Sequence, residues 1–203
     1  MTSLPNLLTL SRIFVIPILV VLFYLPGDGA RWAACILFSA AGITDYFDGY
    51  LARSSGQVSA FGRFLDPIAD KLMVATAILI LVATDAISGW MVLPALVILI
   101  REILVSGLRE FLAELNVGVP VSRLSKWKTA LQMVALGFLI VGTAAPAWLP
   151  AVPIGEAGLW VAAALTLVTG YDYLVTGLRH MGAGPGVETA AEAPKRAPAG
   201  PAE

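Results

Sequence analysis

The sequence predicts an all-α protein that crosses a membrane six times. Of its 203 residues, 58% are hydrophobic and only 13% are charged. That balance is typical of multi-pass membrane proteins rather than of soluble domains. The apolar residues gather in six segments, each long enough to cross a bilayer as a helix. Turn-forming residues separate the segments, and no stretch shows the alternating pattern of a β-strand.

The six apolar segments define the expected helices in chain order. They are Leu7–Leu25, Trp32–Ala52, Phe64–Ala83, Trp90–Phe111, Trp127–Ala145 and Ile154–Leu178. Breaks rich in Gly, Pro, Ser, Asn or Asp lie at residues 26–29, 54–56, 84–89, 116–120 and 146–155. More apolar segments follow the first one directly, so we expect it to be a retained helix rather than a cleaved signal peptide.

The positive charges predict the orientation of these helices. An even number of spans puts both termini on the same side of the membrane. When each Lys and Arg is assigned to the nearer end of its span, 12 of the 13 fall on that side, and only Arg31 lies opposite. The positive-inside rule then places both termini and the loops after the second and fourth helices in the cytoplasm. We expect the cell (inner) membrane as the location.

Two regions of different composition are expected. Residues 1–181 form one six-helix transmembrane domain. In residues 182–203, 15 of the 22 are Ala, Gly or Pro, without an apolar period. Such a segment cannot bury enough apolar surface to become ordered, so we predict a disordered cytoplasmic tail.

Four aspartates lie at the adjoining ends of the second and third segments. Asp45, Asp48 and Gly49 share one helical face, and Asp66 and Asp70 are spaced by four, so they share another. Acidic side chains are costly at membrane depth and usually mark a functional site. These carboxylates would repel one another unless cations cancelled their charge. We therefore predict a metal site at this end of the helices.

The residue types indicate which metal this site would bind. Carboxylates without Cys or His form a hard oxygen donor set that suits Mg²⁺ or Mn²⁺. A pair of such ions can hold the attacking and leaving oxygens of a phosphoryl transfer. An alternative leaves these residues structural: Asp66-Pro67 also has the form of a helix start, and Asp45 and Asp48 could pair with Arg53 and Arg63.

This stretch resembles the signature of the CDP-alcohol phosphatidyltransferase family, D-x-x-D-G-x-x-A-R, eight residues, then G-x-x-x-D-x-x-x-D. Every fixed position of that pattern is matched between residues 45 and 70. Members of this family replace the CMP of a CDP-activated lipid or alcohol with another alcohol, and they are commonly homodimers. The resemblance implies Asp45, Asp48 and Asp66 as metal ligands and Asp70 as the general base, with a metal contact as well. It places Gly49, Ala52 and Arg53 beside the cytidine and phosphates.

Three further strings resemble the branch of the family that joins CDP-diacylglycerol to glycerol 3-phosphate. They are P-N-x-x-T-x-x-R from residue 5, R-E-I-L-V-S-G-L-R-E from residue 101 and S-K-W-K-T-A-L-Q-M from residue 125. The resemblance implies that the nucleotide-lipid site includes Asn6, Thr9 and Arg12. It also implies that the acceptor's phosphate contacts Arg109, Arg123, Lys126 and Lys128.

The basic residues also have simpler explanations. Arg12 could extend to the membrane interface. Arg101 could face the same cavity as Arg109, or it could neutralise Glu102 or an Asp of the third helix. The cluster around Lys126 and Lys128 could be an interfacial group anchored by Trp127.

Rival functions make different demands on the same residues. Within the family, the acceptor could be inositol phosphate, serine or phosphatidylglycerol. Outside it, a cation transporter would use membrane acids but would leave Gly49, Ala52 and Arg53 unexplained. A structural scaffold has no use for four clustered aspartates. No P-loop string is present and no nucleic-acid partner is expected, so the sequence favours a lipid-modifying transferase.

Overall fold

The computed structural model describes residues 4–55, 60–114 and 123–182, with side chains for 10–44, 65, 68–113, 124–171, 173–175 and 177. This part of the chain forms six α-helices, two short 3₁₀ turns and no strand. The helices are α1 (Leu4–Tyr24), α2 (Asp28–Ser55), α3 (Ala60–Ala83), α4 (Val92–Glu114), α5 (Arg123–Val141) and α6 (Ala151–Gly182). The 3₁₀ turns are η1 (Gly89–Met91), before α4, and η2 (Gly142–Ala144), after α5. The all-α prediction is confirmed.

Each predicted segment corresponds to one helix, but several helix ends differ from the prediction, since α2 already begins at Asp28 and extends to Ser55. The break expected at 146–155 is shorter, because α6 already begins at Ala151. Asp66-Pro67 does not start a helix, since α3 includes Ala60 and runs without interruption to Ala83. Asp66 and Asp70 therefore belong to one continuous helix, a turn apart. The predicted tail (residues 182–203) lies outside the described residues from 183 onward.

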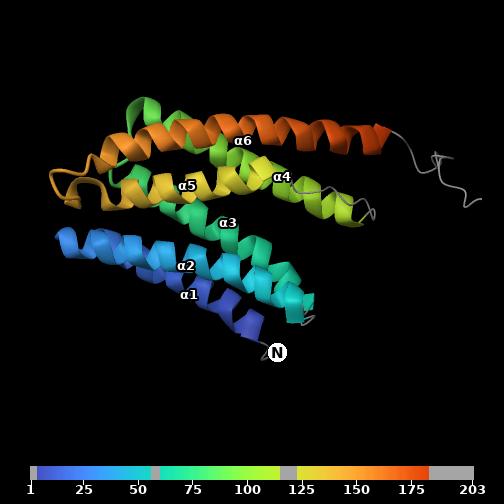
Figure 1. Ribbon diagram of the computed structural model, residues 1–203, viewed down its shortest axis with the longest axis horizontal. Helices are drawn as coiled ribbons and strands as arrows, with labels where there is room; N and C mark the ends of the chain where they lie inside the picture. Colours follow the sequence, from blue (N-terminus) through green and yellow to red (C-terminus); the bar gives the residue numbers. More distant parts are fainter. Residues whose placement is uncertain (1–3, 56–59, 115–122, 183–203) are drawn as a thin grey trace, which may run out of the picture.

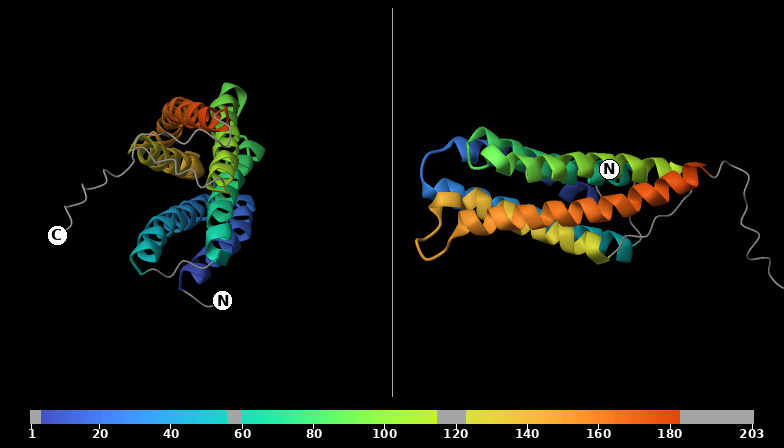
Figure 2. Two further views of the ribbon diagram at one scale, coloured as in Figure 1. Left: turned by 90° about the vertical axis from the view of Figure 1, so that its right-hand side faces the viewer. Right: turned by 90° about the horizontal axis from the view of Figure 1, so that it is seen from above.

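The six helices alternate in direction (Figure 1). The start of α1, the ends of α2 and α4, the starts of α3 and α5 and the end of α6 all lie at the same end of the bundle. Seen from two further directions, the helices form a bundle in which α1 packs on α2 and α3, α2 on α5, and α6 on both α4 and α5 (Figure 2). α3 also contacts α4 and α5. The aspartate-bearing ends of α2 and α3 thus share one end of the molecule.

The outer surface of the bundle is apolar, as expected for a protein in lipid. Within the described residues, three helical stretches are long and apolar enough to cross a membrane: Gly89–Ala113, Leu124–Ala144 and Ala151–Val175. A shorter apolar stretch covers Leu10–Tyr24. Large side chains such as Phe14, Ile103 and Leu167 are exposed on the outside of the helices. These features identify a membrane protein.

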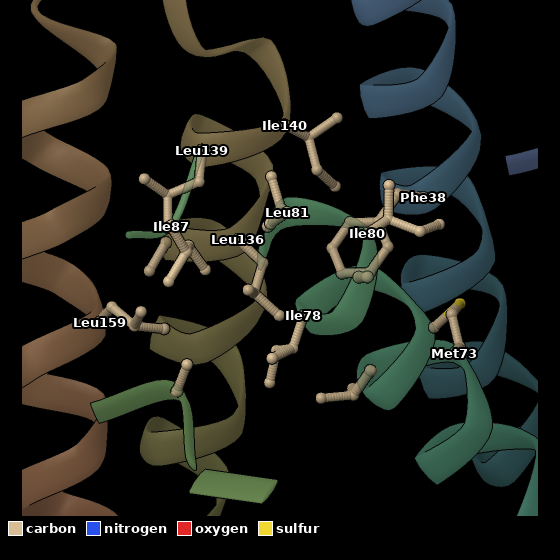
Figure 3. Close-up of a cluster of buried hydrophobic side chains, with 14 of the residues drawn as sticks. Phe38, Met73, Ile78, Ile80, Leu81, Ile87, Leu136, Leu139, Ile140 and Leu159 are labelled. Carbon is tan, nitrogen blue, oxygen red and sulfur yellow. The ribbon is translucent and has the colours of Figure 1, made fainter. Parts of the chain in front are cut away.

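A core of buried apolar side chains joins the helices (Figure 3). Phe38 of α2 and Leu81 of α3 lie among side chains of α5 such as Leu136 and Ile140, and Leu159 of α6 closes the cluster. Burying one such side chain contributes about 1.5–3 kcal/mol relative to exposing it to water. Because lipid is also apolar, close packing rather than exclusion of water holds these helices together.

Helices α5 and α6 approach each other most closely where α6 carries glycine. A Cβ atom on Gly155 would lie 2.7 Å from Cγ of Leu139 and 3.1 Å from the backbone oxygen of Ala135. A Cβ atom on Gly158 would lie 3.0 Å from Cβ of Ala135. Small residues at such crossings let helix backbones pack closely in membranes.

We expect Gly155→Ala to lower the stability of the purified protein in detergent by about 1–3 kcal/mol, because the backbone oxygen of Ala135 blocks the new methyl group. Gly107→Ala is the matched control: it is also a helical glycine, but its Cβ would meet nothing within 4 Å. Thermal unfolding measures both variants. Equal melting temperatures for the two would contradict the close α5–α6 contact.

Candidate active site

The predicted metal ligands lie on two helices, α2 and α3. The end of α2 and the start of α3 lie at the same end of the bundle. Asp45 and Asp48 are in α2, and Asp66 and Asp70 are in α3. Four residues separate the described ends of these helices, which limits the distance between Ser55 and Ala60 to about 18 Å. The side chains of Asp45, Asp48 and Asp66 lie outside the described residues. No cluster of three or more metal-binding side chains occurs among the described ones, which include only Asp70 of the four.

Asp70 is the best-defined residue of the predicted site. Its side chain is 36% exposed, so its carboxylate can reach a ligand, and Oδ2 lies 3.9 Å from Nζ of Lys71. It lines a small pocket between α3, α4 and α5 together with Lys71, Val74, Glu102, Thr129 and Gln132. The pocket volume is about 20 Å³, which is enough for one water-sized group.

A buried ion pair joins α4 to α5 through Glu102, a residue that lines this pocket. The ammonium of Lys128 donates a hydrogen bond to Oε1 of Glu102. The Lys128 side chain is 2% exposed and that of Glu102 is 16% exposed. Asp70 is also near enough to attract the Lys128 ammonium. A charge removed from water needs such partners, so Glu102 accounts for the burial of Lys128.

Lys126 and Lys128, both predicted to bind the acceptor's phosphate, lie in different environments. Lys126 is exposed, whereas Lys128 is buried beside Asp70 and Glu102. Two residues correspond to about 200° around a helix, so the two side chains leave α5 on different faces. Lys128 therefore faces Glu102, which lines the pocket, and Lys126 is exposed on another face of α5.

Arg101 and Arg109 of α4 are also separated by their environments. Arg101 is buried against α6, where Nη2 donates a hydrogen bond to Oγ1 of Thr169 at 3.1 Å. Its guanidinium carbon lies 5.8 Å from the centre of the Tyr173 ring. Arg109 is exposed. Within the described residues no contact of 4 Å or less joins Arg101 to Glu102, whose carboxylate contacts Lys128 of α5, although the two charges are near enough to attract.

Arg12 is the described member of the predicted nucleotide-lipid set. Its side chain is buried in α1, with 3% exposed. A side chain that extends to the membrane interface would stay accessible, so the structure does not support that alternative. The side chains of the other predicted members of this set and of Arg123 lie outside the described residues. These are Asn6, Thr9, Gly49, Ala52 and Arg53.

Comparison with known proteins decides the family. The family model "CDP-alcohol phosphatidyltransferase" matches residues 2–169. The chain belongs to the CDP-alcohol phosphatidyltransferase family. The resemblance predicted from the aspartate motif is thereby confirmed. The matched residues include Asp70 and the other residues that line its pocket.

Curated relatives within the family cover most of the chain. A CDP-diacylglycerol–glycerol-3-phosphate 3-phosphatidyltransferase of Rickettsia typhi is 50% identical over 85% of this chain and 96% of its own length. Proteins with the same name from Escherichia coli K12 and Cereibacter sphaeroides are 45% and 39% identical. They cover 85% and 88% of this chain, and 93% and 97% of their own lengths.

Glu102 and Gln132 are two pocket residues for which the sequence predicted no role in binding or catalysis. Both line the pocket with Asp70, and Gln132 is only 1% exposed. The sequence did contain a signal for both residues, because a charged or amide side chain inside an apolar membrane helix is expected to face a polar partner or a cavity. Their common pocket depends on how α3, α4 and α5 pack.

We expect Lys128→Met to destabilise the ligand-free protein by about 3 kcal/mol or more, because it leaves the Glu102 carboxylate without its cation. Thermal unfolding in detergent measures this change. Lys126→Met, at an exposed position on the same helix, is the matched control and should stay within about 0.5 kcal/mol of the wild type.

A double variant tests the pairing itself. Combining Lys128→Met with Glu102→Gln should recover much of the lost stability, because no buried charge then lacks a partner. Additive losses in the double variant would show that the two residues do not depend on each other.

Proposed function

We propose that this protein transfers the phosphatidyl group of CDP-diacylglycerol to glycerol 3-phosphate, giving phosphatidylglycerophosphate and CMP. The observation that carries the proposal is the 50% identity to the Rickettsia typhi enzyme of that name over 96% of its length. The pocket that Asp70 lines supports the proposal, because it brings two carboxylates and polar side chains together, and one of these carboxylates, Glu102, pairs with the buried Lys128.

The reaction requires the movement of one proton and the exchange of one bond. The primary hydroxyl oxygen of glycerol 3-phosphate forms a bond to the phosphorus that carries diacylglycerol. The bond from that phosphorus to the oxygen of CMP breaks, and CMP leaves with the electron pair. Asp70 takes the proton of the hydroxyl, for which its partly exposed carboxylate at the pocket is suited. Transfer of this kind depends mainly on positioning and charge neutralisation.

The donor set suits two Mg²⁺ or Mn²⁺ ions. Asp45, Asp48, Asp66 and Asp70 supply only carboxylate oxygens, and the continuous helices α2 and α3 keep the members of each pair one turn apart. When bound, such ions neutralise the diphosphate and the charge that develops on the leaving CMP. The same carboxylates would otherwise repel the diphosphate.

The remaining predicted residues divide between the two substrates. For the nucleotide and diphosphate we propose Asn6, Thr9, Arg12, Gly49, Ala52 and Arg53. For the phosphate of glycerol 3-phosphate we propose Arg109, Arg123, Lys126 and Lys128. Of these four, Lys128 is the one whose ammonium pairs with Glu102, a residue that lines the Asp70 pocket.

We also propose that all six helices span the cell (inner) membrane, with the active site and both termini in the cytoplasm. The alternating helices support this arrangement, because they bring the described ends of the chain to the aspartate-bearing end (Figure 1). Residues 1–181 would form the catalytic domain and residues 182–203 a tail. The homodimer implied by the family resemblance stays a prediction.

The acceptor is tested by supplying several alcohols to the purified protein. With Mg²⁺ or Mn²⁺ and CDP-diacylglycerol, we expect release of CMP when glycerol 3-phosphate is added. Inositol phosphate, serine and phosphatidylglycerol, assayed in parallel, should release far less. A preference for one of these would assign the chain to another branch of the family, and metal transport across liposomes without CMP release would favour a transporter.

Asp70→Asn should lower kcat by about 10²–10⁴-fold, the usual contribution of a positioned general base. Asp85→Asn is the matched control, because Asp85 is an exposed aspartate in the connection after α3, at the other end of that helix. Its positive φ of 56° is also acceptable to asparagine. CMP release at saturating substrates measures both variants. Near-normal turnover by Asp70→Asn would remove Asp70 from the chemistry.

A further inference from the structure

Gln132 lines the Asp70 pocket and carries a buried polar atom that is unmatched within the described residues. The residue is 1% exposed, and its Oε1 atom accepts no hydrogen bond from the described residues. Neighbouring groups in the same pocket are matched. The Thr129 hydroxyl donates to the backbone oxygen of Ser125 at 3.1 Å, and Glu102 accepts from Lys128. A buried acceptor without a donor costs free energy, which a ligand supplying that donor would recover.

The charges and the size of the Asp70 pocket indicate which kind of ligand group can enter it. Asp70 and Glu102 both line the pocket, and their carboxylates oppose the entry of a phosphate. A volume of about 20 Å³ holds a group the size of a hydroxyl, so the rest of a glycerol phosphate would extend beyond the pocket. A hydroxyl both donates and accepts, so it matches the Gln132 amide in either orientation.

We propose that Gln132 binds the middle hydroxyl of glycerol 3-phosphate and so determines which acceptor alcohol the enzyme uses. The inference rests on the proposed function. Glycerol 3-phosphate carries two hydroxyls on adjacent carbons, so when the primary one is at Asp70 the other is one carbon away. Gln132 lines the same pocket as Asp70, and the phosphate would remain outside that pocket.

Two acceptors that differ only at this hydroxyl test the assignment. Glycerol 3-phosphate is compared with 3-hydroxypropyl phosphate, which keeps the attacking hydroxyl and the phosphate but lacks the middle hydroxyl. CMP release from CDP-diacylglycerol in Mg²⁺ gives kcat/KM for each. We expect the wild type to prefer glycerol 3-phosphate by about 10²-fold or more, because a site built to bind a hydroxyl discriminates strongly against its absence.

Gln132→Met keeps a side chain of similar length and removes the amide. This variant should lose about 10²-fold or more in kcat/KM for glycerol 3-phosphate while its value for 3-hydroxypropyl phosphate changes less than about threefold. The preference then disappears. Its melting temperature without substrate should be no lower than that of the wild type, because no hydrogen bond to Oε1 within the described residues is lost.

Thr166→Val is the matched control, because Thr166 is also fully buried with an unmatched oxygen, but it lies on α6 and does not line the pocket. It should leave the acceptor preference unchanged.

Three results would overturn the inference: equal use of the two acceptors by the wild type, a preference that survives in Gln132→Met, or a proportional loss with both acceptors. The first needs no variant, so it decides the matter even if Gln132→Met does not fold. Failure of the proposed function looks different, since the wild type would then release no CMP with either acceptor.

Discussion

The ion pair between Lys128 and Glu102 is the interaction on which the candidate site depends. It connects α5 to α4 inside an apolar bundle, where lipid offers neither charge a partner. The pair lies beside Asp70 of α3, so three helices meet at one polar point. Without Glu102, an ammonium next to the predicted base would have to leave the interior or lose its proton. The Glu102 carboxylate therefore keeps a cation next to the residue proposed as the general base.

Contacts with α6 hold in place the two helices that carry the Lys128–Glu102 pair. Helix α5 packs along α6 through Gly155 and Gly158, and α6 holds α4 through the hydrogen bond from Arg101 to Thr169. Glycine also permits that second contact, since a Cβ on Gly170 would lie 3.0 Å from Cγ of Arg101. The helices carrying Glu102 and Lys128 are thus both fixed against α6, which limits how far the pair can separate.

The sequence predicted the features that depend on positions along the chain. Apolar runs and turn residues located all six helices, and the fixed spacing from Asp45 to Asp70 identified the family. Features that depend on rotation and contact between helices were missed. Glu102 follows Arg101 directly, yet about 100° of helical rotation sends one to α5 and the other to α6. Gln132 likewise gained significance only when its neighbour across the pocket was known to be Asp70.

The small volume of the Asp70 pocket has a consequence for the fidelity of the proposed enzyme. A space that accepts one hydroxyl accepts water equally well, and the same carboxylate would activate it. Attack by water would convert the activated lipid into phosphatidic acid and waste the nucleotide. Size alone cannot prevent this hydrolysis, so protection would have to come from coupling the reaction to occupancy of the residues proposed to bind the acceptor's phosphate. Binding the acceptor at both its hydroxyl end and its phosphate end would then help the enzyme to avoid hydrolysis of its lipid substrate.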